Sequence, residues 1–332
     1  MSTPFRTNAH VAQPPLAHAA GCGCPLHARR RWGTAALSTL AAGSAWAQQD
    51  MVIPEGSRAV AAAAPTGPTA AAQEWAECKR SGFTKLSGSA EQIEQMASQQ
   101  YAQMLQKASG SKALGPINHP QVQRLRYIAK RIVPLTFACN PRAKSWQWDV
   151  NLIGSEQLNA FCMPGGKIAF YYGILAKLQL SDDEVAMIMG HEVAHALLEH
   201  ARERMGKSNA TRVGVELGAA ILGLGNLGRT VAGAGEQLVN LTFSRSDESE
   251  ADALGLVLAA NAGYNPQAGV TLWQKMGAAS KGAPPQWLST HPSGKTRVKD
   301  MEARMARVQP MYERAPKPDQ QFGPPALKSQ PS

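Results

Sequence analysis

The sequence contains no apolar run long enough to cross a membrane as a helix. A spanning helix needs roughly 20 consecutive apolar residues. The two best candidates, residues 33–44 and 213–228, are shorter, and Glu216 and Asn226 interrupt the second. We therefore do not expect a protein built around several spanning helices. Three interpretations of the second segment stay open: a buried helix, a mobile lid over a site, or a segment resting on a membrane surface.

Clusters of Lys and Arg interleaved with aromatic residues are also missing after residue 47. The 332-residue chain has 34 Lys and Arg against 24 Asp and Glu, but four of the arginines lie in residues 1–47. Without those residues the net charge falls from +10 to +6. Nucleic-acid binding requires basic side chains gathered on one face, so we expect no nucleic-acid partner.

Residues 1–47 have the order of a secretory signal peptide. Three consecutive arginines, 29–31, precede the short apolar segment 33–44. Ala45-Trp46-Ala47 then gives the small-x-small pattern of a cleavage site. We expect cleavage after Ala47 and export of the mature chain.

The mature chain divides into three parts by composition. Residues 48–75 are rich in Ala, Pro and Gly without a periodic apolar face, which predicts a disordered linker. The folded domain is predicted over residues 76–314. Residues 315–332 are rich in Pro and Gln, and we expect them to form a disordered tail.

Only three cysteines remain once the signal is removed, namely Cys78, Cys139 and Cys162. An odd number in an oxidising compartment is typical of one disulfide and one free thiol. We expect Cys78 to pair with Cys139, because Cys162 lies in a stretch with another expected role. Three buried free thiols are the alternative, and the sequence leaves it open.

Helices dominate the predicted secondary structure. Ser89 with Gln92 forms a capping box before an amphipathic helix, and a second helix is expected over 122–133. Pro164-Gly165-Gly166 is a strong turn signal between two short strands. Together with an earlier alternating stretch, the strands are expected at 146–153, 159–162 and 167–172. This pattern predicts an α+β fold with a small antiparallel sheet.

The stretch HEVAH carries the first chemical signal. Ser181 and Glu184 form another capping box, and we expect a helix from Asp182 to Arg204. His191 and His195 lie one turn apart on it, so both can bind one metal ion. Glu192 between them is placed to take a proton from water activated by that metal. This HExxH arrangement is typical of zinc peptidases, although a helix with this spacing by chance is the alternative.

His200 follows in the same stretch but is not expected to bind the metal. It lies nine residues after His191, which is about 180° around a continuous helix. We therefore place His200 on the solvated face, together with Glu199.

A catalytic zinc usually has three protein ligands and a water. The histidine spacing of the metzincins is absent, because Leu198 and Ala201 occupy the positions of its glycine and its third histidine. Glu248 in SRSDESEAD can supply the third ligand, and Asp252 one turn later can hold a ligand imidazole in place. We interpret Asp247 and Glu250 as solvated acids.

The combined motifs HExxH and SRxxExxAD resemble those of the zinc metalloprotease family that includes HtpX, the CaaX prenyl endopeptidases, BepA and LoiP. The second motif is present as Ser244, Arg245, Glu248, Ala251 and Asp252. The resemblance covers about 149–297. It implies a mostly helical zincin-type metalloprotease domain that holds one Zn²⁺ per chain and cleaves peptide bonds.

The resemblance also implies roles for residues outside these motifs. Asn159, Ala160 and Phe161 would offer backbone groups to an extended substrate. His291 would stabilise the oxyanion or bind zinc as a fourth ligand, and Arg297 would support His291.

The lack of spanning segments favours the periplasmic members of this family, which are linked to quality control of outer-membrane proteins. The resemblance therefore implies unfolded or misassembled envelope proteins as substrates, and peripheral contact with the membrane or the outer-membrane assembly machinery. The non-enzymatic alternative is a zinc-containing, chaperone-like module that binds such proteins without cleaving them. The general base Glu192 argues against that alternative.

Overall fold

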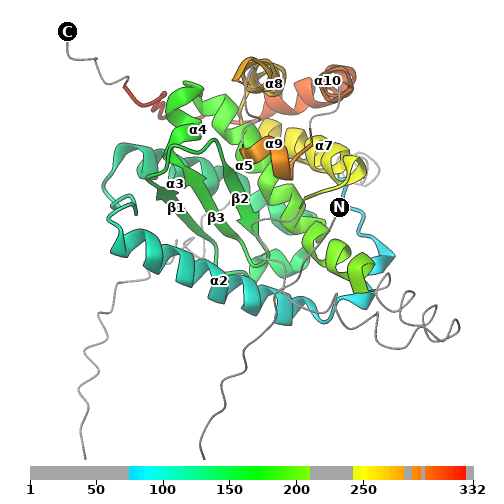
Figure 1. Ribbon diagram of the computed structural model, residues 1–332. Helices are drawn as coiled ribbons and strands as arrows, with labels where there is room; N and C mark the ends of the chain where they lie inside the picture. The colour runs from blue at the N-terminus through cyan, green and yellow to red at the C-terminus, as the bar shows by residue number, and fades with distance from the viewer. Residues whose placement is uncertain (1–74, 210–241, 280–285, 293–295, 327–332) are drawn as a thin grey trace, which may run out of the picture. The chain divides into compact units, whose positions relative to one another are not determined.

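The computed structural model describes residues 75–209, 242–279, 286–292 and 296–326 (Figure 1). The expected signal peptide, almost all of the expected linker and the segment 213–228 lie outside these ranges. Within them, no helix is both long and apolar enough to span a bilayer.

Helices surround one three-stranded sheet (Figure 1). The predicted α+β class, dominated by helices, is confirmed. In chain order the elements are η1 (Gly82–Leu86), α2 (Ala90–Gly110), α3 (Pro120–Ile132), η2 (Val133–Ala138), η3 (Pro141–Lys144), β1 (Asp149–Ile153), β2 (Ala160–Met163), β3 (Lys167–Tyr171), α4 (Tyr172–Lys177), α5 (Asp182–Leu197), α7 (Arg245–Asn261), α8 (Ala268–Ala279), α9 (Gln286–Thr290) and α10 (Arg297–Arg314).

The sheet is mixed, whereas the sequence predicted an antiparallel one. Its strand order is β1-β3-β2, with β3 antiparallel to β2 and parallel to β1. The tight turn at Gly165 and Gly166, which have φ of 82° and 76°, forces β2 and β3 to run in opposite directions. The chain between β1 and β2 crosses to the far side of β3, so β1 runs parallel to β3. This order leaves β2 at an edge of the sheet.

Side chains alternate in direction along each strand, so the two faces of the sheet pack into different hydrophobic cores. Residues such as Cys162, Ile168 and Phe170 join the main core, which includes buried residues of α3, α5 and α7. Residues such as Phe161 and Ala169 face the other way, against Ala97 and Tyr101 of α2 and their neighbours. The sheet thus lies between α2 and the helices that carry the metal-binding motifs (Figure 1).

Three helices begin with a complete capping box. Those at Ser89 and Ser181 were predicted and are confirmed. The third was not predicted: the N–H of Ser244 donates to Asp247 Oδ2 at 2.8 Å, and the N–H of Asp247 donates to Ser244 Oγ at 3.2 Å. Asp247 is buried, so its interpretation as a solvated acid is wrong. Its carboxylate fixes the start of α7.

The helix expected from Asp182 to Arg204 is interrupted. Helix α5 ends at Leu197, Glu199 has a φ of 60°, and helical residues resume at 200–209. A left-handed residue reorients the next helical turn. The carboxylate of Glu199 is held by Arg202 and is buried, so its predicted place on a solvated face is also wrong.

Cys78 and Cys139 form a disulfide with a Cα–Cα distance of 5.2 Å, as predicted. The bridge closes a loop with a sequence separation of 61 residues, for which loss of unfolded-state entropy predicts a stabilisation of about 4 kcal/mol. Cys162 is a buried free thiol, and burial raises its pKa.

The first twelve residues of the expected disordered tail pack against the domain instead. Two backbone N–H groups, of Phe322 and Gly323, donate to the Asp182 carboxylate at 2.8 and 3.2 Å. The N–H of Asp319 donates to the hydroxyl of Tyr127 at 3.1 Å. The prediction of disorder is therefore wrong for residues 315–326, because polar groups of α3 and α5 bind this backbone.

Two glycines let α5 and α7 come into backbone contact. A Cβ added to Gly190 would lie 2.8 Å from the carbonyl oxygen of Gly255, and one added to Gly255 would lie 2.8 Å from the backbone nitrogen of His191. Any larger residue at either position must push the helices apart. The contact lies directly beside the first histidine of the HExxH motif.

Substitution at this crossing has a predictable effect. Gly190→Ala is expected to lower the free energy of unfolding by about 1–3 kcal/mol, because the added methyl overpacks the helix contact. Gly277→Ala is the matched control, because a Cβ on Gly277 in α8 meets nothing within 4 Å. The free energy of unfolding of that variant is expected to rise by about 0.5–1 kcal/mol, because alanine loses less backbone entropy on folding than glycine does. Denaturant unfolding measures both values, and equal stability of the two variants would contradict the account.

Candidate metal centre

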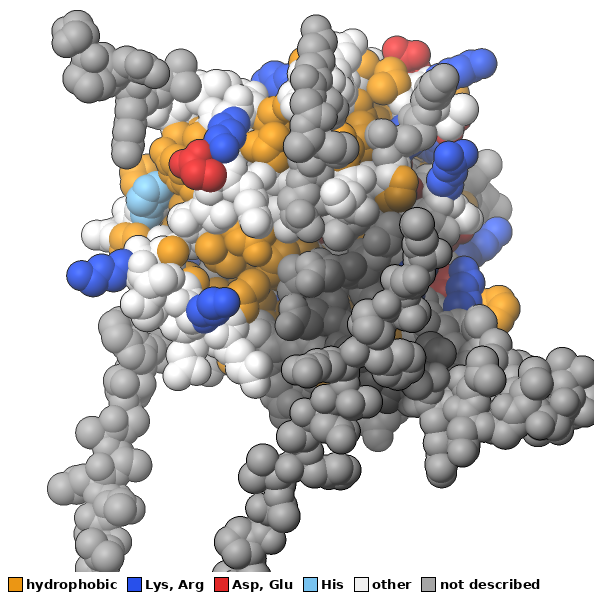
Figure 2. All heavy atoms as spheres, in the orientation of Figure 1, with side chains coloured by type: hydrophobic (Ala, Val, Ile, Leu, Met, Phe, Trp, Pro, Cys, Tyr) orange, Lys and Arg blue, Asp and Glu red, His pale blue; other side chains and the backbone are white. Residues whose placement is uncertain are grey.

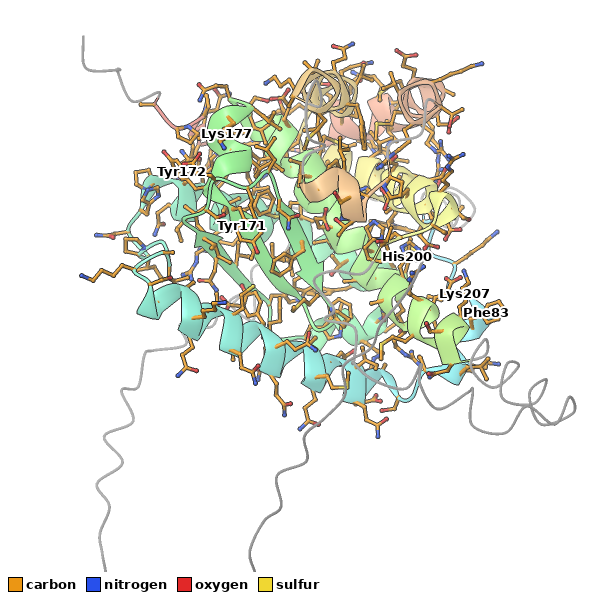
Figure 3. All side chains as sticks on the ribbon, in the orientation of Figure 1. Phe83, Tyr171, Tyr172, Lys177, His200 and Lys207 are labelled. Atoms are coloured by element: carbon orange, nitrogen blue, oxygen red, sulfur yellow. A yellow bond between two sulfur atoms is a disulfide. The ribbon has the colours of Figure 1, made fainter. Side chains whose placement is uncertain are left out.

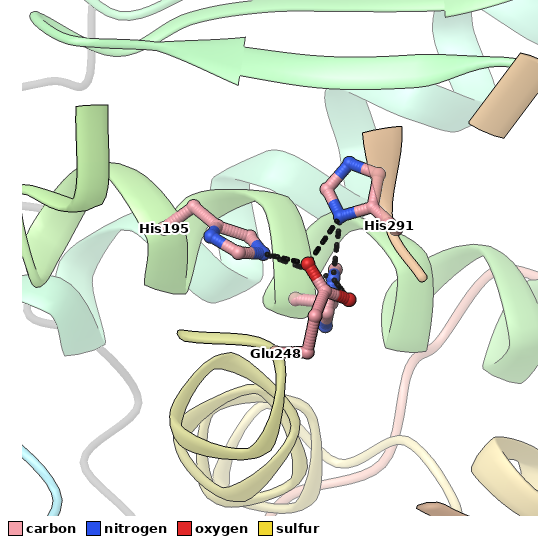
Figure 4. Close-up of side chains that lie close together, drawn as sticks. His195, Glu248 and His291 are labelled. Carbon is pink, nitrogen blue, oxygen red and sulfur yellow. Dashed lines mark hydrogen bonds and ion pairs between the residues drawn. The ribbon is translucent and has the colours of Figure 1, made fainter. Parts of the chain in front are cut away.

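Four buried side chains from three parts of the chain meet at one point. His191 and His195 come from α5, Glu248 from α7, and His291 from the residue just after α9. One ligand atom from each lies within 4.8 Å of the others. Figure 4 shows His195 and His291 directed at the Glu248 carboxylate.

The distances between these atoms suit a small tetrahedral cation. His191 Nε2 lies 3.1 Å from His195 Nε2 and 3.2 Å from His291 Nδ1. The Glu248 carboxylate oxygens lie 2.9 Å from His291 Nδ1, 3.4 Å from His195 Nε2 and 3.6 Å from His191 Nε2. A tetrahedral ion with ligand bonds near 2.0–2.1 Å separates its donor atoms by about 3.3 Å. The residues present therefore fit a zinc ion.

The electrostatic environment favours the metal-binding protonation states of Glu248 and His195. Burial alone would raise the pKa of Glu248, but the imidazoles of His291, His195 and His191 outweigh it and hold that pKa well below its usual value. Burial lowers the pKa of His195 well below its usual value, so this imidazole is neutral. A carboxylate and a neutral imidazole are the forms that bind metal.

Asp252 contacts the donor His191, and Arg297 contacts the donor Glu248. His191 Nδ1 lies 3.0 Å from Asp252 Oδ1, which leaves Nε2 to face the cluster. Arg297 donates to both Asp252 oxygens and to Glu248 Oε2, each at 2.6 Å. Burial opposes ionisation of Asp252, but Arg297 outweighs it and lowers the pKa of the carboxyl.

Arg297 thus has a different neighbourhood from the one expected. The resemblance implied that it supports His291, whereas its guanidinium binds Glu248 and Asp252 and stacks over Trp273 at 3.8 Å from the ring centroid. The physical reason is charge. Leaving two buried carboxylates without a cation would cost more free energy than leaving an imidazole without one.

Glu192 lies beside the cluster and is 2% exposed. The indole Nε1–H of Trp287 donates to Glu192 Oε1 at 2.7 Å, and His291 Nε2 lies 3.5 Å from the same oxygen. Trp287 was not predicted. Its only sequence signal is its position four residues before His291, one helical turn away, and its ring stacks on that of His291.

Backbone hydrogen bonds place α9 over this site. The N–H of Trp287 donates to the carbonyl of Leu158 at 3.0 Å, and the N–H of Phe243 donates to the carbonyl of Thr290 at 3.0 Å. The first bond ties α9 to the segment before β2, and the second ties it to the segment before α7. His291 is thereby held against residues that are 100 positions away in sequence.

His200 is buried beside the metal-binding cluster and does not lie on the solvated face. It is 1% exposed, and its Nδ1 lies 2.8 Å from Nδ1 of His195. The helix break at Glu199 cancels the 180° rotation that a continuous helix would give. Figure 3 shows His200 at the junction between α5 and the helical residues that follow it. The assignment of His200 to the solvated face is wrong for this reason.

The sequence carries the family signature across the same region. Residues 120–305, more than half of the chain, match the model of Peptidase family M48. The chain belongs to peptidase family M48. The predicted resemblance is therefore confirmed, and membership of a metallopeptidase family implies a metal cofactor.

Several curated proteins are similar to this M48 chain. Mitochondrial metalloendopeptidase OMA1 of Schizosaccharomyces pombe is 34% identical over 197 residues, which cover 58% of this chain and 56% of the relative. The β-barrel assembly-enhancing protease of Yersinia pestis is 30% identical over 172 residues, covering 48% and 35%. Metalloprotease LoiP of Escherichia coli is 28% identical over 233 residues, covering 68% and 84%. The chain spans little more than half the length of the first of these relatives.

The residues predicted to bind substrate lie on and just before the edge strand of the M48 domain. The carbonyl of Asn159 accepts from the N–H of Tyr171 on β3, and its side-chain Oδ1 accepts from the N–H of Ala160. Backbone groups alternate in direction along an antiparallel strand. Ala160 and Cys162 therefore direct their carbonyls away from β3, whereas Asn159 and Phe161 direct theirs to β3. The prediction that Asn159 and Phe161 offer backbone groups to a substrate does not fit this sheet.

A cleft adjoins this edge beside His195. Its lining is mainly apolar, and Figure 2 shows that apolar side chains are exposed on the face that carries α9 and the sheet. The lining includes Cys162, Met163, Pro164, Ala196 and Phe243. An extended chain beside β2 would pass this cleft and the metal cluster together.

Removal of the carboxylate donor tests the metal centre. Glu248→Ala is expected to weaken zinc binding by more than the roughly 100-fold that loss of a supporting residue costs, because it removes a direct ligand and one of the two carboxylates that Arg297 binds. Competition with a chromophoric chelator measures the affinity. Glu302→Ala, at an exposed position of α10, should bind zinc like the wild type. Unchanged affinity in Glu248→Ala would exclude this residue as a ligand.

Proposed function

We propose that the chain is a zinc-dependent endopeptidase of the bacterial cell envelope. The observation that carries the proposal is the position of the buried carboxylate of Glu192 beside a four-donor cluster, with β2 at an edge of the described sheet. A site that only stored a metal would need no buried carboxylate beside the cluster but outside the ligand set. Family membership supports the same conclusion.

The donor set favours zinc over other divalent ions. Imidazole nitrogens with one carboxylate oxygen are typical zinc ligands, whereas Mg²⁺ and Ca²⁺ prefer oxygen alone. We assign His191, His195 and Glu248 as ligands to one Zn²⁺. When bound, zinc would polarise the scissile carbonyl and lower the pKa of water toward 7.

Glu192 acts as the general base in this proposal. Trp287 occupies Oε1 through its indole N–H, which leaves Oε2 to take a proton from the attacking water. The same carboxyl then delivers the proton to the nitrogen of the leaving amine. Burial of Glu192 excludes bulk water, which strengthens its interaction with the reacting groups.

His291 has two proposed roles that depend on its position. In this conformation its Nδ1 lies among the donors, which favours binding as a fourth ligand. Displacement by substrate would free the ring to stabilise the oxyanion. Asp252 and Arg297 position His191 and Glu248, so they support the metal and do not touch the substrate.

The substrate is proposed to be an unfolded or misassembled polypeptide that adds to the edge strand β2. The carbonyls of Ala160 and Cys162 are the proposed acceptors, while the backbone groups of Asn159 and Phe161 face β3. Pairing through backbone groups tolerates many sequences, which suits a protease that degrades damaged proteins.

Periplasmic location is part of the proposal. It is supported by the Cys78–Cys139 disulfide, which is typical of an oxidising compartment, and by the expected signal peptide. Similarity to LoiP and to a β-barrel assembly-enhancing protease further supports a role in envelope protein quality control. Peripheral contact with the membrane or with the outer-membrane assembly machinery belongs to the same proposal.

Replacement of the general base separates catalysis from metal binding. Glu192→Gln is expected to bind one zinc per chain but to lose at least about 100-fold of the cleavage rate of casein, because the amide cannot accept the proton. Proteolysis is followed by release of labelled peptides, and zinc by elemental analysis. Glu302→Gln, at an exposed position, controls for loss of one negative charge. Full cleavage by Glu192→Gln would disprove the mechanism.

The same variant distinguishes the chaperone-like alternative. A module that only holds misfolded proteins would protect them from aggregation equally well in the wild type and in Glu192→Gln, without cleavage by either. Expression of Glu192→Gln in the envelope, followed by identification of the proteins that co-purify, would identify the natural substrates.

A further inference from the structure

We propose that His200 is a positioning residue for the metal ligand His195, and that Glu250 fixes the tautomer in which His200 acts. The proposal rests on the proposed function only in that His195 binds the metal. It adds His200, which lies outside both motifs, and Glu250, which stands at an unspecified position of the second motif.

The short contact between the two imidazoles requires one donor and one acceptor. Nδ1 of His195 and Nδ1 of His200 lie 2.8 Å apart, and both rings are buried. His195 Nε2 faces the other metal donors, at 3.1 Å from His191 Nε2 and 3.4 Å from Glu248. That nitrogen must carry a lone pair to bind the metal, so the proton of His195 sits on Nδ1. His200 Nδ1 is therefore the acceptor.

The far side of His200 completes the pattern. A neutral imidazole that accepts at Nδ1 carries its proton at Nε2. His200 Nε2 makes no hydrogen bond among the described residues, but Glu250 Oε2 lies 3.5 Å away, where its charge favours a proton on that nitrogen. Ser246 Oγ–H donates to Glu250 Oε1 at 3.2 Å. Glu250 was interpreted as a solvated acid, and its side chain is indeed half-exposed, but one of its oxygens faces His200.

Two features of the fold serve this arrangement. The left-handed Glu199 is what turns His200 back toward His195, and a continuous helix would direct the ring away. The ring of Phe243 stacks on His195 with centroids 4.0 Å apart. His195 is thus fixed by an aromatic ring on its face and by an imidazole at its edge.

The two histidine ligands of α5 are therefore supported differently. His191 faces the carboxylate of Asp252, which Arg297 holds in place. His195 faces a neutral ring. Supporting hydrogen bonds to ligand histidines typically change metal affinity 10–100-fold when removed, so loss of the His200 acceptor has a measurable consequence.

The test compares two substitutions in the full mature chain. Asn places a carbonyl oxygen near the position of the His Nδ1, whereas Leu fills similar space without an acceptor. We expect His200→Leu to weaken zinc binding 10–100-fold in chelator competition, and His200→Asn to stay close to the wild type. Thermal unfolding of the metal-free proteins should be similar for both variants, because the contact serves the metal-bound geometry.

Two outcomes would overturn the proposal: wild-type affinity in His200→Leu, or the same loss in both variants. If His200→Leu does not fold, proton NMR of the zinc-loaded wild type decides. A slowly exchanging His195 Nδ1–H signal that persists in His200→Asn supports the proposal, and its absence from the wild type refutes it. Failure of the wild type to bind zinc would instead refute the proposed function.

Glu250 is tested in both backgrounds. Glu250→Ala alone is expected to weaken zinc binding, by less than His200→Leu because water reaches this half-exposed side chain. Added to His200→Asn it should have no further effect, since Asn has no tautomer to fix. An equal loss in both backgrounds would remove Glu250 from the proposal.

Discussion

The backbone contact between α5 and α7 at Gly190 and Gly255 is the constraint on which the site depends. His191 follows Gly190 directly, and Glu248 lies seven residues before Gly255, which is about two turns along α7. The ligand atoms of the two helices meet because no side chain separates the helices where they cross. Helices α9 and α10 then add His291 and Arg297 to a pair of helices already in place.

Electrostatics explains why this arrangement suits a divalent cation. The site buries three carboxylates, of Glu192, Glu248 and Asp252, and the guanidinium of Arg297. Their formal charges sum to −2, which burial makes costly. A bound divalent cation would neutralise this charge, and the side-chain donors would replace the water that the ion loses. Hydrogen bonds donated by Arg297 fix Glu248 and Asp252, and one donated by Trp287 fixes Glu192. In the proposed arrangement, His200 accepts a hydrogen bond that fixes the imidazole of His195.

Local sequence patterns predicted the parts of the site that depend on one element. The spacing of His191 and His195, the Glu248–Asp252 pair, and the capping boxes at Ser89 and Ser181 each depend on a single helix. His200 was misplaced because Glu199 is neither Gly nor Asn, so nothing local marks a left-handed residue there. Trp287 and the glycine contact depend on which surfaces of distant helices meet. The parallel pairing of β1 with β3 likewise depends on a crossover that strand patterns do not encode.

The most direct measurement is anomalous diffraction at the zinc absorption edge from crystals of the zinc-loaded protein. The account predicts one strong peak at about 2.0–2.2 Å from Nε2 of His191, Nε2 of His195 and a Glu248 oxygen. The Nδ1 atoms of both histidines should face away from it, toward Asp252 and His200. A peak at another position, or none at this cluster in a crystal that contains zinc, would contradict the central claim.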